Sequence, residues 1–377
     1  MSANARTASP LAEVAAVALR LGFTAFGGPA VHIAMLREEV VVRRRWLTDD
    51  EFLDLLGVTN LIPGPNSTEM VIHVGLRRAG WAGFAVGGLL FILPAAAIVL
   101  ACAWAYVAYG QTPGAGWVLY GIKPVIIAVV LQAIWGLART AVKTIPLALV
   151  AVAGLGLYLA GVNELLILFG GGLLVAIVRS LRSHRDARYA FVPLLAMAEP
   201  RDLARLTLVF LKIGAVLYGS GYVLVAFLRS EFVDRLGWLT DRQLLDAVAV
   251  GQFTPGPVFT TATFVGYLIG SWSGAFLATA AIFLPSFVFV ALTSRFVPHL
   301  RRSTFASAAL DGVNVAALAL MAGVVWQLGR AAIVDVFTAV LAIIAAVCLL
   351  RWKINSAWLV LGGAGIAVAA RLLGVTF

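Results

Sequence analysis

The chain has 377 residues, of which 62% are apolar and only 12% are charged, and its formal net charge is +10. With a mean hydropathy of +0.97, this composition excludes an ordinary soluble globular protein, which needs a larger polar surface. The arginines stand in short loops between apolar stretches, as in inner-membrane proteins, so the positive charge does not indicate nucleic acid. Cys102 and Cys348 lie far apart within apolar segments, which argues against a disulfide framework or a cysteine metal site.

The first half of the chain, residues 11–182, follows an N-terminal tail over residues 1–10. It contains apolar segments long enough to cross about 30 Å of hydrocarbon. The predicted crossing segments are 11–28, 80–109, 115–139, 143–160 and 163–182.

Residues 49–78 read differently from the crossing segments. Their two arms, 50–62 and 66–77, are each about 12 residues long, roughly 18 Å of helix, which reaches only half way through a bilayer. This length predicts a re-entrant hairpin that enters and leaves on one side of the membrane. The Pro-Gly-Pro sequence at 63–65 would form its tip near the midplane.

The second half of the chain, residues 203–377, repeats the first. A shift of 192 positions aligns 27–65 with 219–257 without a gap, and 18 of the 39 aligned pairs are identical. The two halves are therefore copies of one membrane domain, joined by a predicted cytoplasmic basic linker over 183–202.

The charges of the loops predict that the two copies are inserted in opposite directions. The first copy is basic at Arg77 and Arg139, whereas the second copy is uncharged around Gly270 and basic at 295–302. Because basic loops remain in the cytoplasm, this alternation indicates inverted-topology repeats, as in many secondary transporters. The predicted fold is an all-α polytopic protein of the inner (plasma) membrane, with about ten transmembrane helices and two re-entrant hairpins. This count places both termini outside the cytoplasm.

Each copy contains two breaks at which glycine and proline interrupt the helical pattern. Non-helical backbone at membrane depth is tolerated only where it is buried in protein or lines a cavity. A half-helix that begins after such a break directs free N–H groups and the positive end of its dipole at an anion. A simple kink is the alternative for one break, but paired breaks in opposed copies favour a binding role. The predicted substrate-binding residues at the breaks are Gly27, Gly28, Pro29, Pro63, Gly64, Pro65, Asn66, Ser67, Thr68, Gly219, Ser220, Gly221, Pro255, Gly256, Pro257, Thr260 and Thr261.

Ionisable side chains within the apolar segments add to this predicted site. Arg20 and Lys212 are aligned, each about seven residues before a glycine break, so we expect them to bind substrate unless they snorkel to the interface. Lys123 is a further candidate cation. Glu69 and His73 lie four residues apart on one half-helix and have no counterparts in the second copy. They are predicted to couple transport to protons, unless they merely satisfy each other.

The sequence predicts structural rather than functional roles for two aligned aspartates. Asp54 and Asp246 stand in the first arm of each hairpin, shortly after Thr48 and Thr240. These threonines are predicted helix N-caps, with acidic residues in the first turn. We therefore expect capping and packing roles for the aspartates.

Several of these motifs resemble the chromate ion transporter family over almost the whole chain. The resemblance in the first half is carried by residues 26–29, His32, the run 43–46 and the run 63–69. In the second half it is carried by 219–222, 251–258 and 283–285, although the glycine break reads Gly-Ser-Gly rather than Gly-Gly-Pro. The resemblance implies a two-domain membrane protein that exports chromate from the cytoplasm and confers chromate resistance, with these signature positions at its site.

The expected partner is therefore chromate or a related oxyanion, moved by the membrane potential or the proton motive force. Sulfate transport or exchange stays open because sulfate is a near-isosteric dianion. A non-transporting intramembrane enzyme is the alternative from another class, but no nucleophile elbow, phosphate loop or zinc signature is present in the sequence. A cation channel is disfavoured by Arg20 and Lys212. No cofactor and no metal are expected, and a homodimer is left open.

Overall fold

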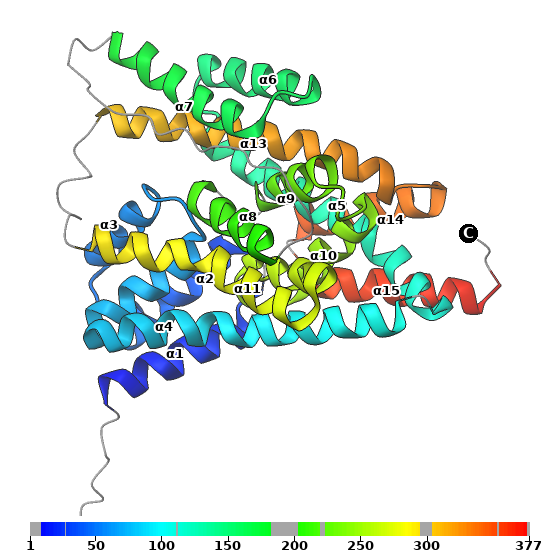
Figure 1. Ribbon diagram of the computed structural model, residues 1–377, viewed down its shortest axis with the longest axis horizontal. Helices are drawn as coiled ribbons and strands as arrows, with labels where there is room; N and C mark the ends of the chain where they lie inside the picture. The colour runs from blue at the N-terminus through cyan, green and yellow to red at the C-terminus, as the bar shows by residue number, and fades with distance from the viewer. Residues whose placement is uncertain are drawn as a thin grey trace, which may run out of the picture.

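The computed structural model describes residues 9–26, 28–110, 112–181, 203–218, 223–294, 304–352 and 354–374, and its regular structure in these ranges is helical, without strands. Figure 1 shows the arrangement. The first half contains α1 (Pro10–Thr24), α2 (Pro29–Arg37), α3 (Asp49–Thr59), α4 (Asn66–Tyr109), α5 (Pro113–Ala141), α6 (Ile145–Leu159) and α7 (Glu164–Leu181). The second half contains α8 (Leu203–Val216), α9 (Val223–Leu228), α10 (Asp241–Phe253), α11 (Thr261–Thr293), α13 (Thr304–Ala332), α14 (Val336–Trp352) and α15 (Ser356–Leu372).

The outer surface of the molecule is apolar. Ile145 on α6, Val336 on α14 and Trp358 on α15 are 78%, 80% and 71% exposed. Large apolar surfaces of this kind indicate contact with lipid. Four of the described helical stretches are long and apolar enough to cross a membrane: Asn66–Tyr109, Gly114–Ala141, Val258–Thr293 and Ala308–Ala332. The predicted all-α membrane protein is thus confirmed, whereas the number of crossings stays a prediction.

α4 is a helical hairpin rather than one continuous rod. Its backbone leaves the helical region at Ala79 and at Gly80, where φ is +61°. Beyond this turn the second part folds back on the first, so that a Cβ on Gly75 would lie 2.2 Å from the carbonyl oxygen of Gly83. The boundary agrees with the predicted separation of the half-helix 66–77 from the crossing segment 80–109.

α11 repeats this hairpin in the second half. Its backbone is non-helical at Gly270 and Ser271, and a Cβ on Gly266 would lie 2.4 Å from the carbonyl oxygen of Gly274. The hydroxyls of Thr263 and Thr279 are 2.7 Å apart across the two arms.

α1 differs from its prediction because it forms one arm of a further hairpin. It ends at Thr24 after 15 residues, or about 22 Å of helix. Gly28, with φ of +85°, then turns the chain into α2. Arg20 of α1 lies 3.1 Å from Glu39 in the π-helical turn that follows α2, so the chain runs back alongside α1. The prediction of one continuous helix over 11–28 is therefore wrong, and a membrane crossing by this segment stays a prediction.

Both hairpins of the first half return to the same end of the bundle. Arg78, at the end of the half-helix in α4, contacts Glu13 at the start of α1. The Arg78 guanidinium also lies 5.3 Å from the ring of Trp46, beyond α2. We call this end the Arg78 end. The opposite end, where Leu203 at the start of α8 packs on Gly270, is the Gly270 end.

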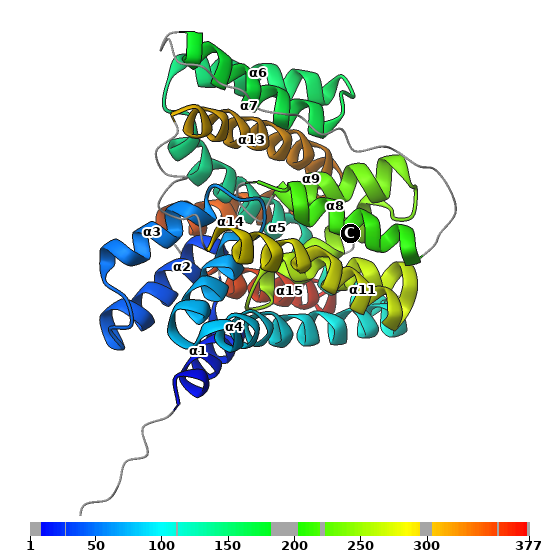
Figure 2. The same ribbon diagram turned by 60° about the vertical axis from the view of Figure 1, so that its left-hand side comes forward.

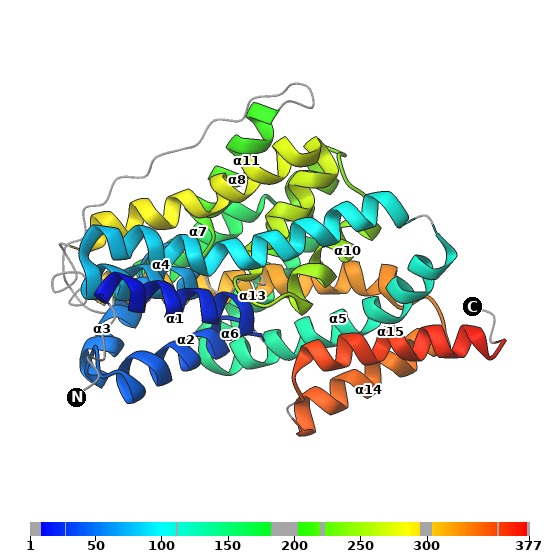
Figure 3. The same cartoon turned by 90° about the horizontal axis from the view of Figure 1, so that it is seen from below.

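The two halves run in opposite directions at their centre. Phe84 of α4 packs on Phe287 of α11 with ring centroids 5.5 Å apart, and Tyr106 packs on Phe264 at 5.3 Å. The long arm of α4 begins near Phe84, whereas the long arm of α11 ends near Phe287, so these two arms are antiparallel, as Figure 3 shows.

The packing of one half is repeated in the other. α1 packs on α4 as α8 packs on α11, and α5 contacts α14 and α15 as α13 contacts α6 and α7. Figure 2 shows α6 and α7 of the first half beside α13 of the second. One long helix of each half, α5 or α13, therefore packs against the last two helices of the other half.

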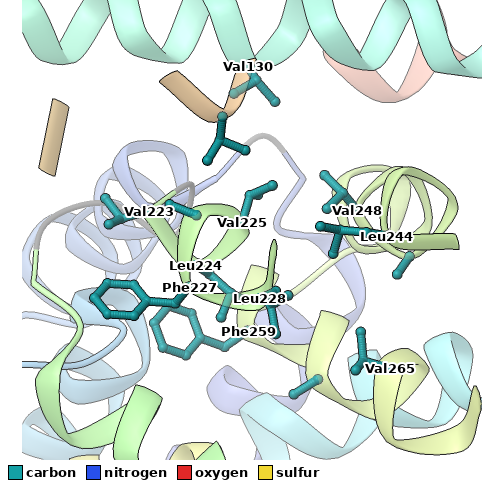
Figure 4. Close-up of a cluster of buried hydrophobic side chains, with 14 of the residues drawn as sticks. Val130, Val223, Leu224, Val225, Phe227, Leu228, Leu244, Val248, Phe259 and Val265 are labelled. Carbon is teal, nitrogen blue, oxygen red and sulfur yellow. The ribbon is translucent and has the colours of Figure 1, made fainter. Parts of the chain in front are cut away.

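The interior of the second half is built around α9. In Figure 4, Phe227 of α9 lies beside Phe259, while Leu244 and Val248 come from α10. Val130 of α5 lies above them. This apolar core holds α9 and α10 in place.

The described chain starts and finishes at opposite ends of the bundle. α1 begins at the Arg78 end, whereas Arg371 near the end of α15 lies 5.9 Å from the ring of Trp117, near the start of α5. The prediction of both termini on one side is therefore wrong for the described helices. α7 ends at the Arg78 end, since Arg179 and Lys143 both contact Asp311. The predicted tail over 1–8 and linker over 183–202 lie outside the described residues.

Candidate functional site

The tip of each hairpin is bonded to the other half of the chain. The backbone N–H of Gly64 donates a hydrogen bond of 2.8 Å to the carbonyl oxygen of Leu217, just after α8. The N–H of Gly256 donates a hydrogen bond of 2.9 Å to the carbonyl oxygen of Ala25, just after α1. The predicted breaks of the two copies thus meet in one central region. Among the predicted break residues, Gly27, Gly219, Ser220 and Gly221 lie outside the described residues.

Glycine is required at both tips. φ is +134° at Gly64 and +87° at Gly256, a region that residues with a Cβ rarely adopt. A Cβ on Gly64 would lie 2.2 Å from Glu69 Oε1 and 2.8 Å from Ser286 Oγ. A Cβ on Gly256 would lie 2.8 Å from the Cβ of Ala95. Each tip therefore packs closely against the long helix of the opposite half.

The first turns after the tips carry unused backbone donors. Within the described residues, the N–H groups of Asn66, Ser67, Val258 and Phe259 have no hydrogen-bond acceptor. Three of these residues are buried: Ser67 is 3%, Val258 8% and Phe259 1% exposed. Such orphan donors at a helix start, with the positive end of the dipole, form a site suited to an anion.

The side chains predicted to surround the anion divide into two groups. The hydroxyl of Thr68 is buried and has no partner among the described residues. In contrast, Thr260 donates to the carbonyl of Pro257 and Thr261 to that of Val258, each at 2.8 Å. These two hydroxyls are engaged within their own turn. Asn66 donates its side-chain N–H to Asn60.

Glu69 lies at the first tip. It is fully buried against Gly64 and Ser286, and neither of its carboxyl oxygens makes a hydrogen bond in the part of the chain described. His73, one turn later, is 2% exposed, and its Nε2 also lacks a partner there. No hydrogen bond joins the two side chains in the described structure, so the alternative in which they satisfy each other finds no support.

One residue near each tip was not among the predicted break residues: His32 near the second tip, through Phe91 beside Gly256, and Ser286 near the first. His32 is 3% exposed and packs edge-on against Phe91, with ring centroids 5.9 Å apart. Ser286 reaches the tip from α11. The only sequence signal for Ser286 is its place after Pro285, since its repeat counterpart is Ala95.

Arg20 and Lys212, predicted to bind the substrate, are engaged elsewhere. Arg20 pairs with Glu39 at 3.1 Å and Lys212 with Glu231 at 2.6 Å, at equivalent positions of the two halves. The side chain of Arg20 is also 56% exposed. Each cation therefore links the first helix of its half, α1 or α8, to the π-helical turn that follows the next helix. Among the described residues, neither cation forms an ion pair or a hydrogen bond with a tip.

Lys123, in contrast, takes part in a buried pair. Its Nζ lies 3.1 Å from Oδ1 of Asp246, whose other oxygen accepts a 2.9 Å hydrogen bond from the Tyr106 hydroxyl. Thr48 and Thr240 are the predicted helix N-caps, and each also forms a capping box with the residue three positions later. Asp246 is therefore a buried charge paired across the two halves, and the packing role expected for it stays a prediction.

A cavity of about 530 Å³ opens near the start of α10. Arg229, Asp241, Gln327 and Arg330 supply its polar lining, and Trp326 is among its apolar lining. Among the described residues, no cluster of three His, Cys, Asp or Glu side chains could hold a metal ion.

Comparisons with known proteins identify a family. A sequence model of the family described as "Chromate transporter" matches residues 12–176 and, a second time, residues 204–368. The "Chromate transport protein" of Cupriavidus metallidurans is 33% identical over 92% of this chain and 90% of its own length. The "Probable chromate transport protein" of Synechococcus elongatus is 31% identical over 95% and 93%. The "Chromate transport protein" of Pseudomonas aeruginosa is 30% identical over 80% and 77%. No solved structure matches the chain.

Proposed function

Because the chain belongs to the chromate transporter family, we propose that it is a secondary transporter that exports chromate from the cytoplasm across the inner membrane and so confers chromate resistance. The observation that carries this proposal is the match of the family to both halves of the chain. Membership of a transporter family also leaves the intramembrane enzyme without support. The comparisons offer nothing in favour of the homodimer.

Chromate would bind between the two tips. The orphan N–H groups of Asn66, Ser67, Val258 and Phe259, two from each half, support this placement. The Thr68 hydroxyl adds a donor on the first side. A tetrahedral dianion can accept several hydrogen bonds at once, and charge-assisted bonds are the stronger kind. Sulfate has the same charge and shape as chromate, so it is the second candidate substrate.

The topology would be inverted, with the Arg78 end in the cytoplasm. The antiparallel packing of α4 on α11 supports the inversion. The Arg78 end carries Arg77, Arg139 and Lys143, whereas the turn at Gly270 is uncharged. Since basic loops stay in the cytoplasm, α1 would begin in the cytoplasm and α15 would end outside.

The membrane potential would drive export. A dianion that leaves a cell whose interior is negative gains about 4.6 kcal/mol per 100 mV, twice the value for a single charge. This energy supports an outward gradient of more than about 10³-fold, since each 1.4 kcal/mol is a factor of ten. Glu69 and His73 would add coupling to protons, and the burial of Glu69 beside the first tip supports that role.

The deciding experiment is chromate flux in proteoliposomes. Purified protein should move labelled chromate down an imposed membrane potential, and an ionophore that collapses the potential should stop the movement. Unlabelled sulfate, added in excess, reports whether the site separates the two dianions. Flux that persists without a potential but needs sulfate on the far side would identify an exchanger. An absence of any oxyanion flux from correctly inserted protein would refute the transporter.

A further inference from the structure

The buried pair of Lys123 and Asp246 lies apart from the two tips. Lys123 comes from α5 of the first half, and Asp246 from α10 of the second. Their charged atoms are 3.1 Å apart, and the side chains are 11% and 0% exposed. Tyr106 of α4 donates its hydroxyl to the second oxygen of Asp246 at 2.9 Å. Three helices from both halves therefore meet at this carboxylate.

The pair stands between the second tip and the Gly270 end. Asp246 precedes Pro255 at the tip by nine residues, about 13 Å along a helix. In the other direction, Asp241 precedes it by five residues, about 8 Å, and lines the cavity described above. Among the described residues, Lys123 is the one lysine or arginine that is buried, and it lies on the Gly270 side of the tips.

Packing alone does not account for this pair. Removing two charges from water is expensive, and a buried ion pair seldom stabilises a fold more than apolar side chains of the same volume. The repeat counterpart of Lys123 is Asn314, so α13 occupies the equivalent place without a cation. Ionisable side chains at membrane depth generally serve transport or another function. The pair also distinguishes the two ends of an otherwise repeated structure.

We propose that Lys123 is a second anion-binding residue, on the Gly270 side of the tips, and that Asp246 is the counter-ion which the transported anion displaces. This inference rests on the proposed function of the chain. An ammonium group bonds equally well to a carboxylate or to an oxyanion. When the anion holds Lys123, Tyr106 still donates to Asp246, so the displaced carboxylate keeps a partner. When the anion leaves, Asp246 forms its ion pair with Lys123 again, and this pair hinders the anion from rebinding.

Four variants test the assignment: Lys123→Gln, Lys123→Arg, Asp246→Asn and the double variant Lys123→Gln/Asp246→Asn. Each is measured for chromate flux in proteoliposomes and for the rise in unfolding temperature that sulfate produces. Lys123→Gln and the double variant should lose at least about tenfold in flux and most of the sulfate effect, the size expected of one charge-assisted hydrogen bond. Lys123→Arg should retain both. Asp246→Asn, freed of the competing carboxylate, should show a lower KM and a larger stabilisation by sulfate.

A structural pair gives the opposite pattern. Both single neutral variants would then be damaged, and the double variant, which leaves no unpaired charge, would regain wild-type flux. That result overturns the inference. If Asp246→Asn does not accumulate, the contrast between Lys123→Arg and the double variant decides the question. Lys143→Gln, at an exposed pair with Asp311, is the matched control. A wild-type protein without any oxyanion flux would refute the proposed function instead, whatever the variants do.

Discussion

The backbone N–H of Gly256 lies 2.9 Å from the carbonyl oxygen of Ala25, and this hydrogen bond joins the last hairpin tip of the chain to the end of its first helix. Gly64 and Leu217 make the same bond with the halves exchanged. Each tip is therefore positioned by the opposite half, and neither half completes the central region alone. Movement of the halves against each other must stretch or break these bonds.

Leucine at either tip glycine should abolish transport. Gly64→Leu and Gly256→Leu both place a side chain at positive φ and against atoms less than 3 Å away, which costs about 1–3 kcal/mol in overpacking. Chromate flux and membrane insertion are measured for both, with Gly136→Leu as control because nothing lies near that glycine. Full resistance in cells that carry one of the two tip variants would contradict the shared central site and show that the tip changed in that variant is scaffold.

Loss of Arg20 should be tolerated. Arg20 is itself more than half exposed, and Arg44 also contacts Glu39 at 2.8 Å, so the buried carboxylate keeps a cation without Arg20. Because Arg44 still pairs with Glu39, we expect Arg20→Gln to preserve folding and to leave KM for chromate within about twofold. A large rise in KM with unchanged stability would return Arg20 to the substrate-binding residues.

Replacement of Glu69 should change how transport depends on pH. Glu69→Gln keeps the shape of the buried side chain next to Gly64 but removes the carboxyl group that we propose to exchange a proton. Flux at fixed membrane potential, measured from pH 5 to 8 against wild type, should lose its pH-dependent part. An identical pH profile in the variant would assign Glu69 to packing.

Cysteine accessibility should place the two ends of the bundle on opposite sides of the membrane. In a background without Cys102 and Cys348, cysteine at Lys143 should react with an impermeant reagent only from the cytoplasm. Cysteine at Thr112 or Val334, both exposed, should react only from outside. Labelling of Thr112 and Lys143 from one side would refute the inverted arrangement.

Local features were predictable because local chemistry determines them. The turn that separates the half-helix from the long arm of α4 lies at Ala79 and Gly80, where the sequence places the boundary. The capping boxes at Thr48 and Thr240 follow from residues three positions apart.

Long-range features were not predictable by the same means. An apolar stretch such as 11–28 has the length of a membrane helix, and its return path depends on Arg20 meeting Glu39. The pair of Lys123 and Asp246 joins residues from different halves, and no period or spacing in the sequence connects them. The inverted orientation and the residues that touch substrate stay predictions.

The crossed hydrogen bonds at the tips also bear on how such a protein can be assembled from parts. A single repeat expressed alone would bury the Gly64 amide without its acceptor and the Ala25 carbonyl without its donor, and each unmade bond costs about 1–3 kcal/mol. In the structure, the second repeat supplies both groups. Fusion of the repeats in one polypeptide thus secures equal numbers of the two partners, which separate genes would have to balance by expression.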